Sequence, residues 1–316
     1  MHAVIYRKFL YAFSVLLIVL SFASLWYPGT RLGIDFTGGS VAEFSFPGGR
    51  PDIEAATDAV RGAFADTDAS VASVQPVGED TIVIKTSTLT EPQKESMIGA
   101  LNTLAGEQKP VLERFSSIGP TVGAELRRNA LLAIGAVILA IVLFITFAFR
   151  HVSEPVSSWK YGLATVVALA HDVIIPTGAY VIFAHFYGVE IDMLFVSALL
   201  AILGFSVHDT IVVFDRIREH LKILHEKGMK EDFKTTVGLS IRQTFARSIN
   251  TSVTTIIVLI CLFIFGPDTI KPFTFTLIAG IIAGTYSSIY IASPLIYTFY
   301  KLQGERGDRP AKKASK

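Results

Sequence analysis

The chain has 316 residues, of which 51% are hydrophobic and 17% are charged, and its formal net charge is +1. Soluble domains carry about 25% charged residues, so this composition excludes an ordinary soluble protein and indicates a polytopic α-helical membrane protein with some water-soluble part. The near-neutral charge gives no reason to expect nucleic-acid binding. The single cysteine, Cys261, excludes an intramolecular disulfide and a multi-cysteine zinc site.

The first apolar run, roughly 9–27, follows two basic residues and predicts the first transmembrane helix. A basic start before an apolar run is also typical of a signal peptide, and a small-x-small pattern for cleavage lies within the run. We favour an uncleaved anchor, because the run continues to Trp26 and Tyr27, aromatic residues that suit a membrane interface. Residues 1–28 are therefore interpreted as a cytoplasmic end and the first helix.

Residues 29–128 have the pattern of a small soluble α+β domain. Thr90 and Gln93 have the spacing of a capping box at the start of a helix. Alternation and turn residues predict a strand at 40–46, a helix at 51–65, strands at 70–77 and 81–87, the helix after Thr90, and a last strand at 109–116. This order predicts a ferredoxin-like, split βαβ module.

Five more apolar runs predict a five-helix transmembrane bundle over 129–300, followed by a basic tail, 301–316. They lie at roughly 130–149, 161–184, 193–214, 246–265 and 273–299. Placing the N-terminus inside puts nearly all Lys and Arg of the short loops in the cytoplasm, since the two short outer loops hold only Lys271. The prediction is therefore six helices, both termini in the cytoplasm and the 29–128 domain outside.

Two acids, Asp172 and Asp209, remain inside the predicted spans however the spans are trimmed. Asp172 lies about 16 Å from the cytoplasmic end of its helix and Asp209 about 8 Å, at about 1.5 Å per residue. Ionisable residues at membrane depth are candidates for an ion or proton path. Arg247 starts the fifth span at a similar depth to Asp209, so it can reach Asp209 if the fourth and fifth helices pack together.

Structural roles are open for the same residues. Asp209 can form a fixed ion pair with Arg247, and Asp172 can serve as a helix-packing hydrogen bond. His171 and His208, about 100° from the neighbouring Asp around each helix, are interpreted as polar contacts, because no further residues have metal-ligand spacing. We therefore expect no metal and no cofactor.

A proton-coupled switch is the functional hypothesis for Asp209 and Arg247. Burial in an apolar medium disfavours a charged carboxylate, whereas a nearby guanidinium, which stays protonated, favours it. Asp209 would then bind a proton when Arg247 moves away and release it when Arg247 returns. Small and polar residues nearby suit close helix packing or can hold water: Thr251, Ser252, Thr254, Thr255, Gly280, Gly284, Ser287 and Ser288.

Several stretches together resemble the SecF family of the bacterial Sec protein-export system. These are GIDFTGGS (33–40), VGAEL (122–126), ALAHDV (168–173), GFSVHDTIVVFDRIRE (204–219), and ARSINTS with GTYSSIYIASPL (246–252 and 284–295). The resemblance runs in order from about residue 30 to about residue 295. The six-span plan agrees with it.

The resemblance implies a partner, SecD, and an architecture like that of the resistance-nodulation-division transporters. It implies that the pair uses the proton gradient of the bacterial inner membrane to help pull unfolded preproteins from the translocation channel. It also implies that Asp209 is the essential acid, that Arg247 is its matching arginine, and that the outer domain helps meet the emerging chain. No nucleotide-binding loop is present, which agrees with a proton gradient as energy source.

This chain departs from the family pattern at His208, where Asn is usual, and at Phe205, where Tyr is frequent. A titratable His beside the acid can join the relay or act as a simple polar substitute. Three other functions are weighed. They are a half-transporter of the larger superfamily exporting lipids or small molecules, an aspartyl intramembrane protease, and an adaptor without a proton role. The protease is disfavoured because Asp172 and Asp209 are not in Tyr-Asp and Gly-x-Gly-Asp settings.

Overall fold

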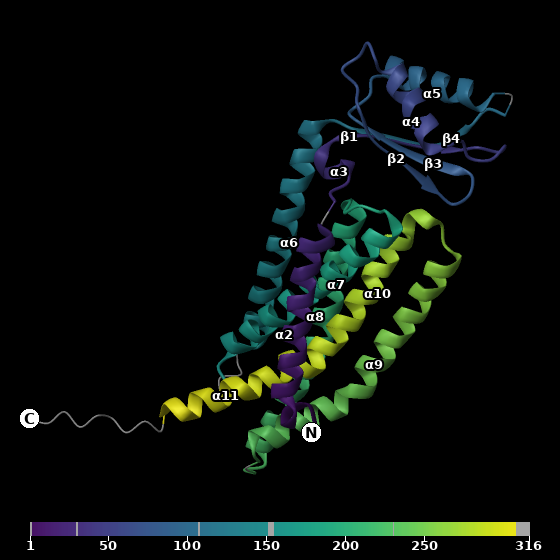
Figure 1. The fold of residues 1–316 in the computed structure, drawn as a ribbon. Helices are drawn as coiled ribbons and strands as arrows, with labels where there is room; N and C mark the ends of the chain where they lie inside the picture. The colour runs from purple at the N-terminus through teal and green to yellow at the C-terminus, as the bar shows by residue number, and fades with distance from the viewer. Residues whose placement is uncertain (1, 30, 107, 151–154, 230, 308–316) are drawn as a thin grey trace, which may run out of the picture. The chain divides into compact units, whose positions relative to one another are not determined.

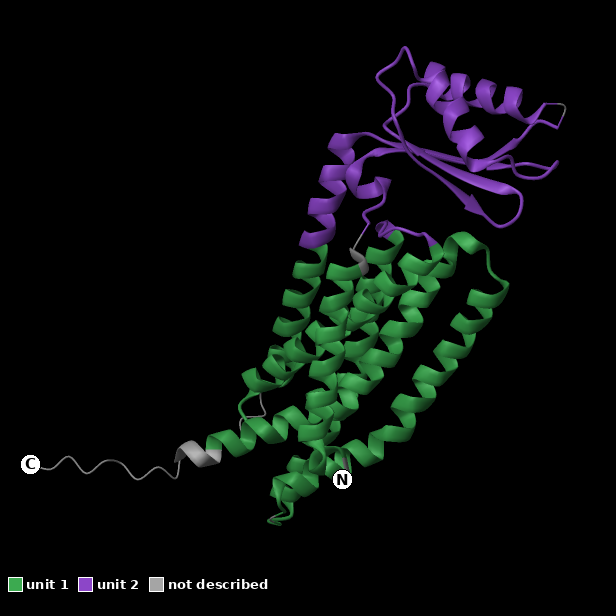
Figure 2. Cartoon of the chain, viewed as in Figure 1, with its two compact units in different colours: residues 1–30, 133–187, 194–316 green, residues 31–132, 188–193 purple. Residues whose placement is uncertain are grey.

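The computed structural model describes residues 2–29, 31–106, 108–150, 155–229 and 231–307. The chain forms two compact units (Figure 2). The membrane unit comprises residues 1–30, 133–187 and 194–316. The outer unit comprises residues 31–132 together with 188–193, the connection between two membrane helices.

The outer unit is built on a four-stranded antiparallel sheet in the order β2-β3-β1-β4 (Figure 1). Its elements are the short α3 (Ile34–Thr37), β1 (Gly39–Ser45), α4 (Ile53–Ala63), β2 (Val71–Val77), β3 (Thr81–Thr86), α5 (Glu91–Ala105) and β4 (Val111–Ile118). Both longer helices pack on one face of the sheet, where Phe44, Ile82 and Ile84 meet Val60 and Met97 in a closed apolar core. The predicted ferredoxin-like order is confirmed.

Local signals explain where the two helices of this unit begin. The Asp52 carboxylate accepts hydrogen bonds from the amides of Glu54 and Ala55 at the start of α4. The capping box predicted for α5 is present. The Gln93 side chain accepts from the Thr90 amide at 2.8 Å, and the Thr90 side chain lies against the backbone amide of Gln93. These contacts satisfy amides that a helix leaves without partners at its N-terminus.

A glycine pair explains why the GIDFTGGS and VGAEL stretches belong together. Gly38 and Gly39 have φ of +74° and +126°, which other residues adopt only with strain. A Cβ on Gly39 would lie 2.7 Å from the carbonyl oxygen of Thr86, and one on Gly123 would lie 2.8 Å from the Gly38 amide nitrogen. The chain leaving the first membrane helix therefore packs backbone to backbone on the start of the second.

Among the residues that the structure describes, six helices are long and apolar enough to cross a membrane. They are α2 (Arg7–Ser24), α6 (Pro120–Ala148), α7 (Ser158–Tyr187), α8 (Met193–Glu226), α9 (Phe233–Phe265) and the last span, made of α10 (Lys271–Ser287), η3 (Ser288–Ala292) and α11 (Ser293–Gly307). Short helical turns α1 (His2–Ile5), η1 (Leu25–Gly29) and η2 (Asp268–Ile270) flank them. The predicted six-span class is confirmed.

The fourth and fifth helices continue well beyond their predicted spans. The segment between the predicted spans 193–214 and 246–265 is therefore mostly helical, because α8 ends at Glu226 and α9 begins at Phe233. The reason is an apolar stripe outside the hydrophobic runs: Phe214 and Ile217 of α8 share a buried cluster with Phe233 and Val237 of α9. Tertiary packing of this kind holds a helix together where its composition alone would not.

The last span changes from an α-helix to a π-helical turn at η3. Pro294 lacks the amide that an α-helix needs at this position. The Ser293 hydroxyl donates to the Ser288 carbonyl at 2.7 Å, so it satisfies an acceptor that the turn leaves free. Such π-turns are frequent at functional sites, and this one directly follows Ser287.

The first helix is packed into the membrane unit rather than lying apart from it. Gly178 of α7 faces Ser21 of α2 so closely that a Cβ on Gly178 would lie 2.4 Å from the Ser21 Cβ. The Ser24 hydroxyl also bonds to the Gly178 carbonyl at 3.2 Å. This contact favours the interpretation of the first helix as an anchor.

Replacing Gly178 with leucine should therefore separate α2 from α7 and destabilise the membrane unit. Overpacking of this kind costs about 1–3 kcal/mol. Thermal unfolding of the purified chain in detergent measures the effect. Gly135→Leu is the matched control, because a Cβ there meets nothing within 4 Å. Equal midpoints for the two variants would contradict the packing described here.

Candidate functional site

Asp172 is the most completely buried acid among the residues whose burial the structure describes, with none of its side chain exposed. Its carboxylate accepts hydrogen bonds from the Ser206 hydroxyl of α8 and, at 2.7 Å, from the Ser287 hydroxyl of α10. The second oxygen lies 2.9 Å from Nδ1 of the neighbouring His171. Asp172 thereby joins α7, α8 and α10, and its partners compensate for the loss of water around the carboxylate.

Small residues bring these three helices together. A Cβ on Gly280 would lie 2.2 Å from Ile202 Cδ1, and one on Gly284 would lie 3.0 Å from the Cβ of Ser206. The predicted G-x-x-x-G face of α10 therefore packs directly on α8, and it brings Ser287 within reach of Asp172. Close backbone approach of this kind is the usual way membrane helices associate.

A series of hydroxyl contacts leads from Asp172 along α8 toward Asp209. The Ser288 hydroxyl bonds to the Ser206 carbonyl at 3.3 Å and pairs with the Thr210 hydroxyl at 2.8 Å. Thr210 directly follows Asp209 in the sequence. The two membrane acids thus belong to one polar region inside an apolar bundle.

Asp209 is also buried, with 3% of it exposed, but its surroundings differ from those of Asp172. One carboxylate oxygen and the Ser248 hydroxyl of α9 are both buried, and neither has a hydrogen-bond partner in the part of the chain that the structure describes. Ser248, His208 and Arg247 are the polar or charged residues near the carboxylate. Asp209 is therefore a buried acid whose hydrogen bonding is incomplete.

Arg247 is near Asp209 but does not pair with it. Its side chain is exposed, and no ion pair between the two residues occurs among the described residues. The fixed structural ion pair weighed as an alternative is not formed in this conformation. Residues 247 and 248 are adjacent on α9, so Ser248 faces Asp209 while Arg247 lies about 100° away around the helix.

The other predicted residues divide into two groups. His171 is buried with Asp172 and stacks on Tyr286, with 5.8 Å between ring centroids, and its Nε2 has no hydrogen-bond partner in the described structure. His208 is exposed and Thr251 is partly exposed, and the Thr251 hydroxyl donates to the Arg247 carbonyl of its own helix. The structure thus brings His171 to its acid and leaves Thr251 on the outside of α9.

Sequence reasoning missed Ser206 and Ser287 as partners of Asp172, and Ser248 as the neighbour of Asp209. A signal for Ser248 exists in the sequence. Thr244, Ser248 and Ser252 recur every four residues, which puts three small polar side chains on one buried face of α9. Thr251 is outside this register.

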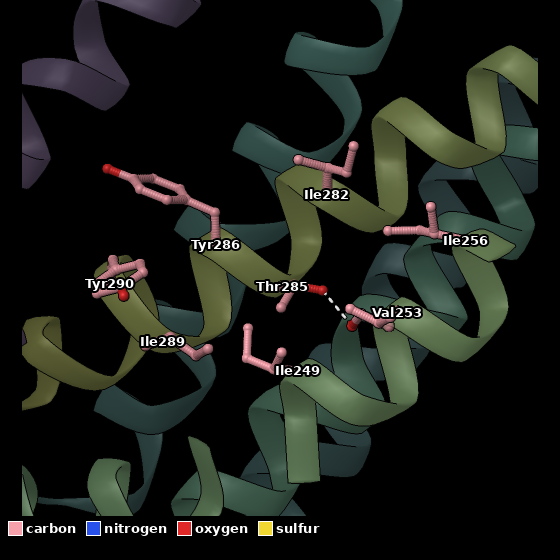
Figure 3. A pocket seen from close by; sticks show the side chains of 9 residues that line it. Ile249, Val253, Ile256, Ile282, Thr285, Tyr286, Ile289 and Tyr290 are labelled. Carbon is pink, nitrogen blue, oxygen red and sulfur yellow. Dashed lines mark hydrogen bonds between the residues drawn. The ribbon is translucent and has the colours of Figure 1, made fainter. Parts of the chain in front are cut away.

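An open apolar groove of about 230 Å³ separates part of α9 from α10 (Figure 3). At its floor the hydroxyls of Ser252 and Thr285 bond at 2.5 Å. The other lining residues are Ile249, Val253, Ile256, Ile282, Tyr286, Ile289 and Tyr290. No charged residue lines the groove, so it does not suit a polar substrate. It leaves one side of α9 loosely packed.

Within the described ranges, no group of three or more His, Cys, Asp or Glu side chains is placed to hold a metal ion. The site is instead a pair of buried carboxylates. Both oxygens of Asp172 have hydrogen-bond partners, one oxygen of Asp209 has none among the described residues, and hydroxyl contacts lead from Asp172 as far as Thr210, the residue next to Asp209. Such an arrangement can bind and release protons.

Known protein families with similar sequences indicate the family of this chain. Residues 99–302 match the family model described as protein export membrane protein SecD/SecF, C-terminal, and residues 24–46 match the SecD/SecF GG motif. This chain belongs to the SecF family of protein-export membrane proteins. The GG motif is the Gly38–Gly39 pair, whose backbone geometry has a direct structural reason in the contact with Thr86 and Gly123.

Two relatives show the range of the SecF family. The protein translocase subunit SecF of Thermobaculum terrenum is 39% identical over 93% of this chain and 92% of the relative. That of Pseudomonas aeruginosa is 32% identical over 92% of this chain and 88% of the relative. The predicted SecF resemblance is confirmed.

A solved structure with the same fold is SecDF of Thermus thermophilus, described as a translocon-associated membrane protein. It has a TM-score of 0.78 and is 29% identical over 95% of this chain. This chain spans 39% of the length of that SecDF chain. A second structure, SecDF in a super-membrane-facing form, has a TM-score of 0.66.

The hydrogen bonds to Asp172 should be measurable as coupling energies. Ser287→Ala should destabilise the purified chain by about 1–2 kcal/mol, because hydrogen bonds to charged groups contribute on that scale. In an Asp172→Leu background the same change should cost little. Thr254→Ala is the control, since its hydroxyl bonds only to carbonyls of its own helix. Strictly additive effects in the double-mutant cycle would rule out the contact.

Proposed function

We propose that this chain works with a SecD partner as a proton-driven auxiliary subunit of Sec protein translocation. It would be an accessory rather than an enzyme, and it would aid the late export of unfolded preproteins through the Sec channel. The family assignment supports the translocation role, because the relatives are named protein translocase subunit SecF. The incomplete hydrogen bonding of buried Asp209 is the observation that supports the proton-driven part.

The proton cycle follows from the geometry of α8 and α9. With Ser248 opposite Asp209, the acid has no charged partner at contact distance, so a proton on the carboxylate is favoured. Arg247 directly precedes Ser248 on α9. A rotation of the helix by about 100°, or an equivalent tilt, would therefore replace the Ser248 hydroxyl opposite Asp209 by the Arg247 guanidinium. The proton would then leave. The open groove beside α9 gives this helix room to move.

Asp172 and His171 would act as the second part of the relay. The hydroxyls of Ser206, Ser288 and Thr210 form a series of contacts between Asp172 and the residue beside Asp209. The buried Nε2 of His171 has no hydrogen-bond partner among the described residues, and we assign it as a further polar position of the relay. Asp172 also holds three helices together, so we assign it both a relay role and a packing role.

The exposed face of α8 supports SecD as the partner. Ala201, Gly204 and His208 are exposed and lie along one stripe of the helix. Small residues allow a partner helix to approach closely, and a polar residue at membrane depth needs a partner or water. The SecDF structure with the same fold has a chain about two and a half times as long as the part matched here, so it contains a further portion of its own.

Orientation and the outer contacts complete the proposal. In the membrane unit, the N-terminus, the connection between α8 and α9, and α11 lie at one end (Figure 1). This end carries most of the Lys and Arg of the unit, so we place it in the cytoplasm of a bacterial inner membrane. The outer unit would then meet the emerging preprotein, and lipid would surround the helices.

Asp209→Asn should abolish the part of export that depends on the proton gradient. We expect a drop of about tenfold or more, the scale of a coupling energy of about 1–3 kcal/mol. The assay is preprotein export in vesicles containing the Sec channel and SecD, with and without an imposed gradient. Asp215→Asn is the matched control, because Asp215 is an exposed acid one and a half turns further along α8. Full gradient dependence in Asp209→Asn would refute the proton role.

Gly204→Leu should weaken assembly with SecD without unfolding this chain. A Cβ at Gly204 meets nothing within 4 Å in the chain itself, so added bulk projects outward. Co-purification from membranes measures the loss of partner, and thermal unfolding of the isolated chain checks that its own stability is kept. Gly135→Leu, also in open space, should keep the partner. Unchanged SecD recovery in Gly204→Leu would exclude this face as the interface.

A further inference from the structure

The connection between α7 and α8 is part of the outer unit, although it joins two membrane helices. Its Ile191 forms a parallel β-bridge with Leu32, in the segment that follows the first membrane helix. The Gly33 amide donates to the Ile191 carbonyl at 2.8 Å, and the Ile191 amide donates to the Arg31 carbonyl at 2.9 Å. We call these two segments, 31–35 and 188–193, the clasp.

A side-chain contact of the clasp holds the first residue of α8. The Asp35 carboxylate accepts a hydrogen bond from the backbone amide of Met193 at 2.8 Å. Amides in the first turn of a helix have no partner within the helix, and a carboxylate there is stabilised by the helix dipole. Gly33 lets the segments meet, since a Cβ on it would lie 3.2 Å from the Ile191 oxygen.

An ion pair fixes the clasp to the sheet. Nζ of Lys85, on the central strand β3, lies 2.9 Å from a carboxylate oxygen of Glu190, and only 14% and 22% of the two side chains are exposed. Partly buried pairs are screened less by solvent than surface pairs. The clasp is therefore held by backbone hydrogen bonds, by a carboxylate on a helix start and by a shielded ion pair.

We infer that the clasp transmits the movement of α8 to the outer unit during export. Asp209 lies sixteen residues from Met193 on the same continuous helix, a distance of about 24 Å at about 1.5 Å per residue. A displacement of α8 around Asp209 therefore reaches the clasp, and the clasp passes it to β3. The inference rests on the proposed function, and it adds Asp35, Lys85 and Glu190 as positioning residues.

Charge exchange tests the ion pair. Lys85→Glu and Glu190→Lys should each lower the amount of preprotein exported per proton taken up, and the double variant should restore it. Exchange at Glu43 and Arg114, an ion pair of 3.8 Å in the same sheet, is the control and should leave the ratio unchanged. The measurement uses vesicles with the Sec channel and SecD, and it follows export and proton uptake separately. A double variant that stays as defective as the single variants would overturn the inference.

Asp35 provides a test that separates coupling from folding. Asp35→Ala removes the acceptor for the Met193 amide and should lower export per proton by roughly tenfold, the equivalent of one lost hydrogen bond to a charged group. Asp35→Asn keeps an acceptor oxygen and should retain most of the coupling. In both variants, Asp209-dependent proton uptake should continue. Loss of proton uptake together with export in Asp35→Ala would contradict a coupling role.

The two levels of the proposal fail in different ways. If Asp209→Asn leaves proton uptake and export unchanged, the proposed function fails. If Asp209→Asn abolishes both while the clasp variants behave like the unaltered chain, only the clasp inference fails.

An engineered disulfide tests whether the clasp stays closed during export. Leu32→Cys with Ile191→Cys, in a Cys261→Ser background, places a cysteine on each of the two bridged segments. Paired segments lie about 4.8 Å apart, which is within the Cα separation that a disulfide spans. Export after oxidation should equal export of the reduced form, because a closed clasp transmits movement. Loss of export on oxidation, with recovery on reduction, would show that the clasp opens and would overturn its role as a rigid link.

Discussion

The cost of placing a carboxylate in an apolar bundle governs the membrane unit. Asp172 meets this cost with donors from two other helices and from its own neighbour, His171. Those donors reach it only because Gly280 and Gly284 let α10 approach α8. Helix spacing, the small-residue face and the buried acid are therefore one structural solution. Removing the carboxylate takes away the acceptor of the Ser206 hydroxyl and leaves the Ser287 hydroxyl with only the Gly284 carbonyl.

Asp209 shows what happens when the same cost is only partly met. A single hydroxyl, that of Ser248, is near it, and a buried carboxylate oxygen has no hydrogen-bond partner among the residues described. An incompletely bonded buried acid contributes less to helix packing than Asp172 does, and the proposed proton role of Asp209 rests on this difference. The contrast between the two acids separates a position that must remain fixed from one that can change partners.

Much of the fold could be predicted because its signals are local. Strand alternation and the Thr90–Gln93 capping box specify the outer unit, and uninterrupted apolar runs specify the helices. The predicted helix boundaries were wrong where tertiary contacts extend a helix, as the packing of Phe214 with Phe233 does for α8 and α9. The pairing of Ile191 with Leu32 could not be predicted either, since a five-residue connection carries no sequence pattern that indicates a partner 159 residues away.

The candidate site could likewise be predicted only in part. Asp172 and Asp209 stand out in the sequence because no choice of span boundaries removes them. To predict whether Ser248 or Thr251 is the neighbour of Asp209, one must know how α9 is oriented about its own axis. Packing against α10 fixes that orientation through the contact of Ser252 with Thr285.

The placement of Arg247 beside Ser248 on α9 has a mechanical consequence. Adjacent helical residues point about 100° apart, so a guanidinium and a hydroxyl cannot both face Asp209. A helix packed on all sides could not exchange them without disrupting its neighbours, because close-packed interfaces shift between discrete arrangements. α9 is not packed in that way: an apolar groove lies on its α10 side, and Ser252 and Thr285 form a single hydroxyl contact at the floor of that groove. We propose that contact as the pivot of the cycle, since it lies one turn from Ser248 and involves no charged group. In the proposed cycle, a proton on Asp209 and a rotation of α9 that brings Arg247 to it are alternative ways to compensate the same buried carboxylate. Protonation would drive movement on that physical basis.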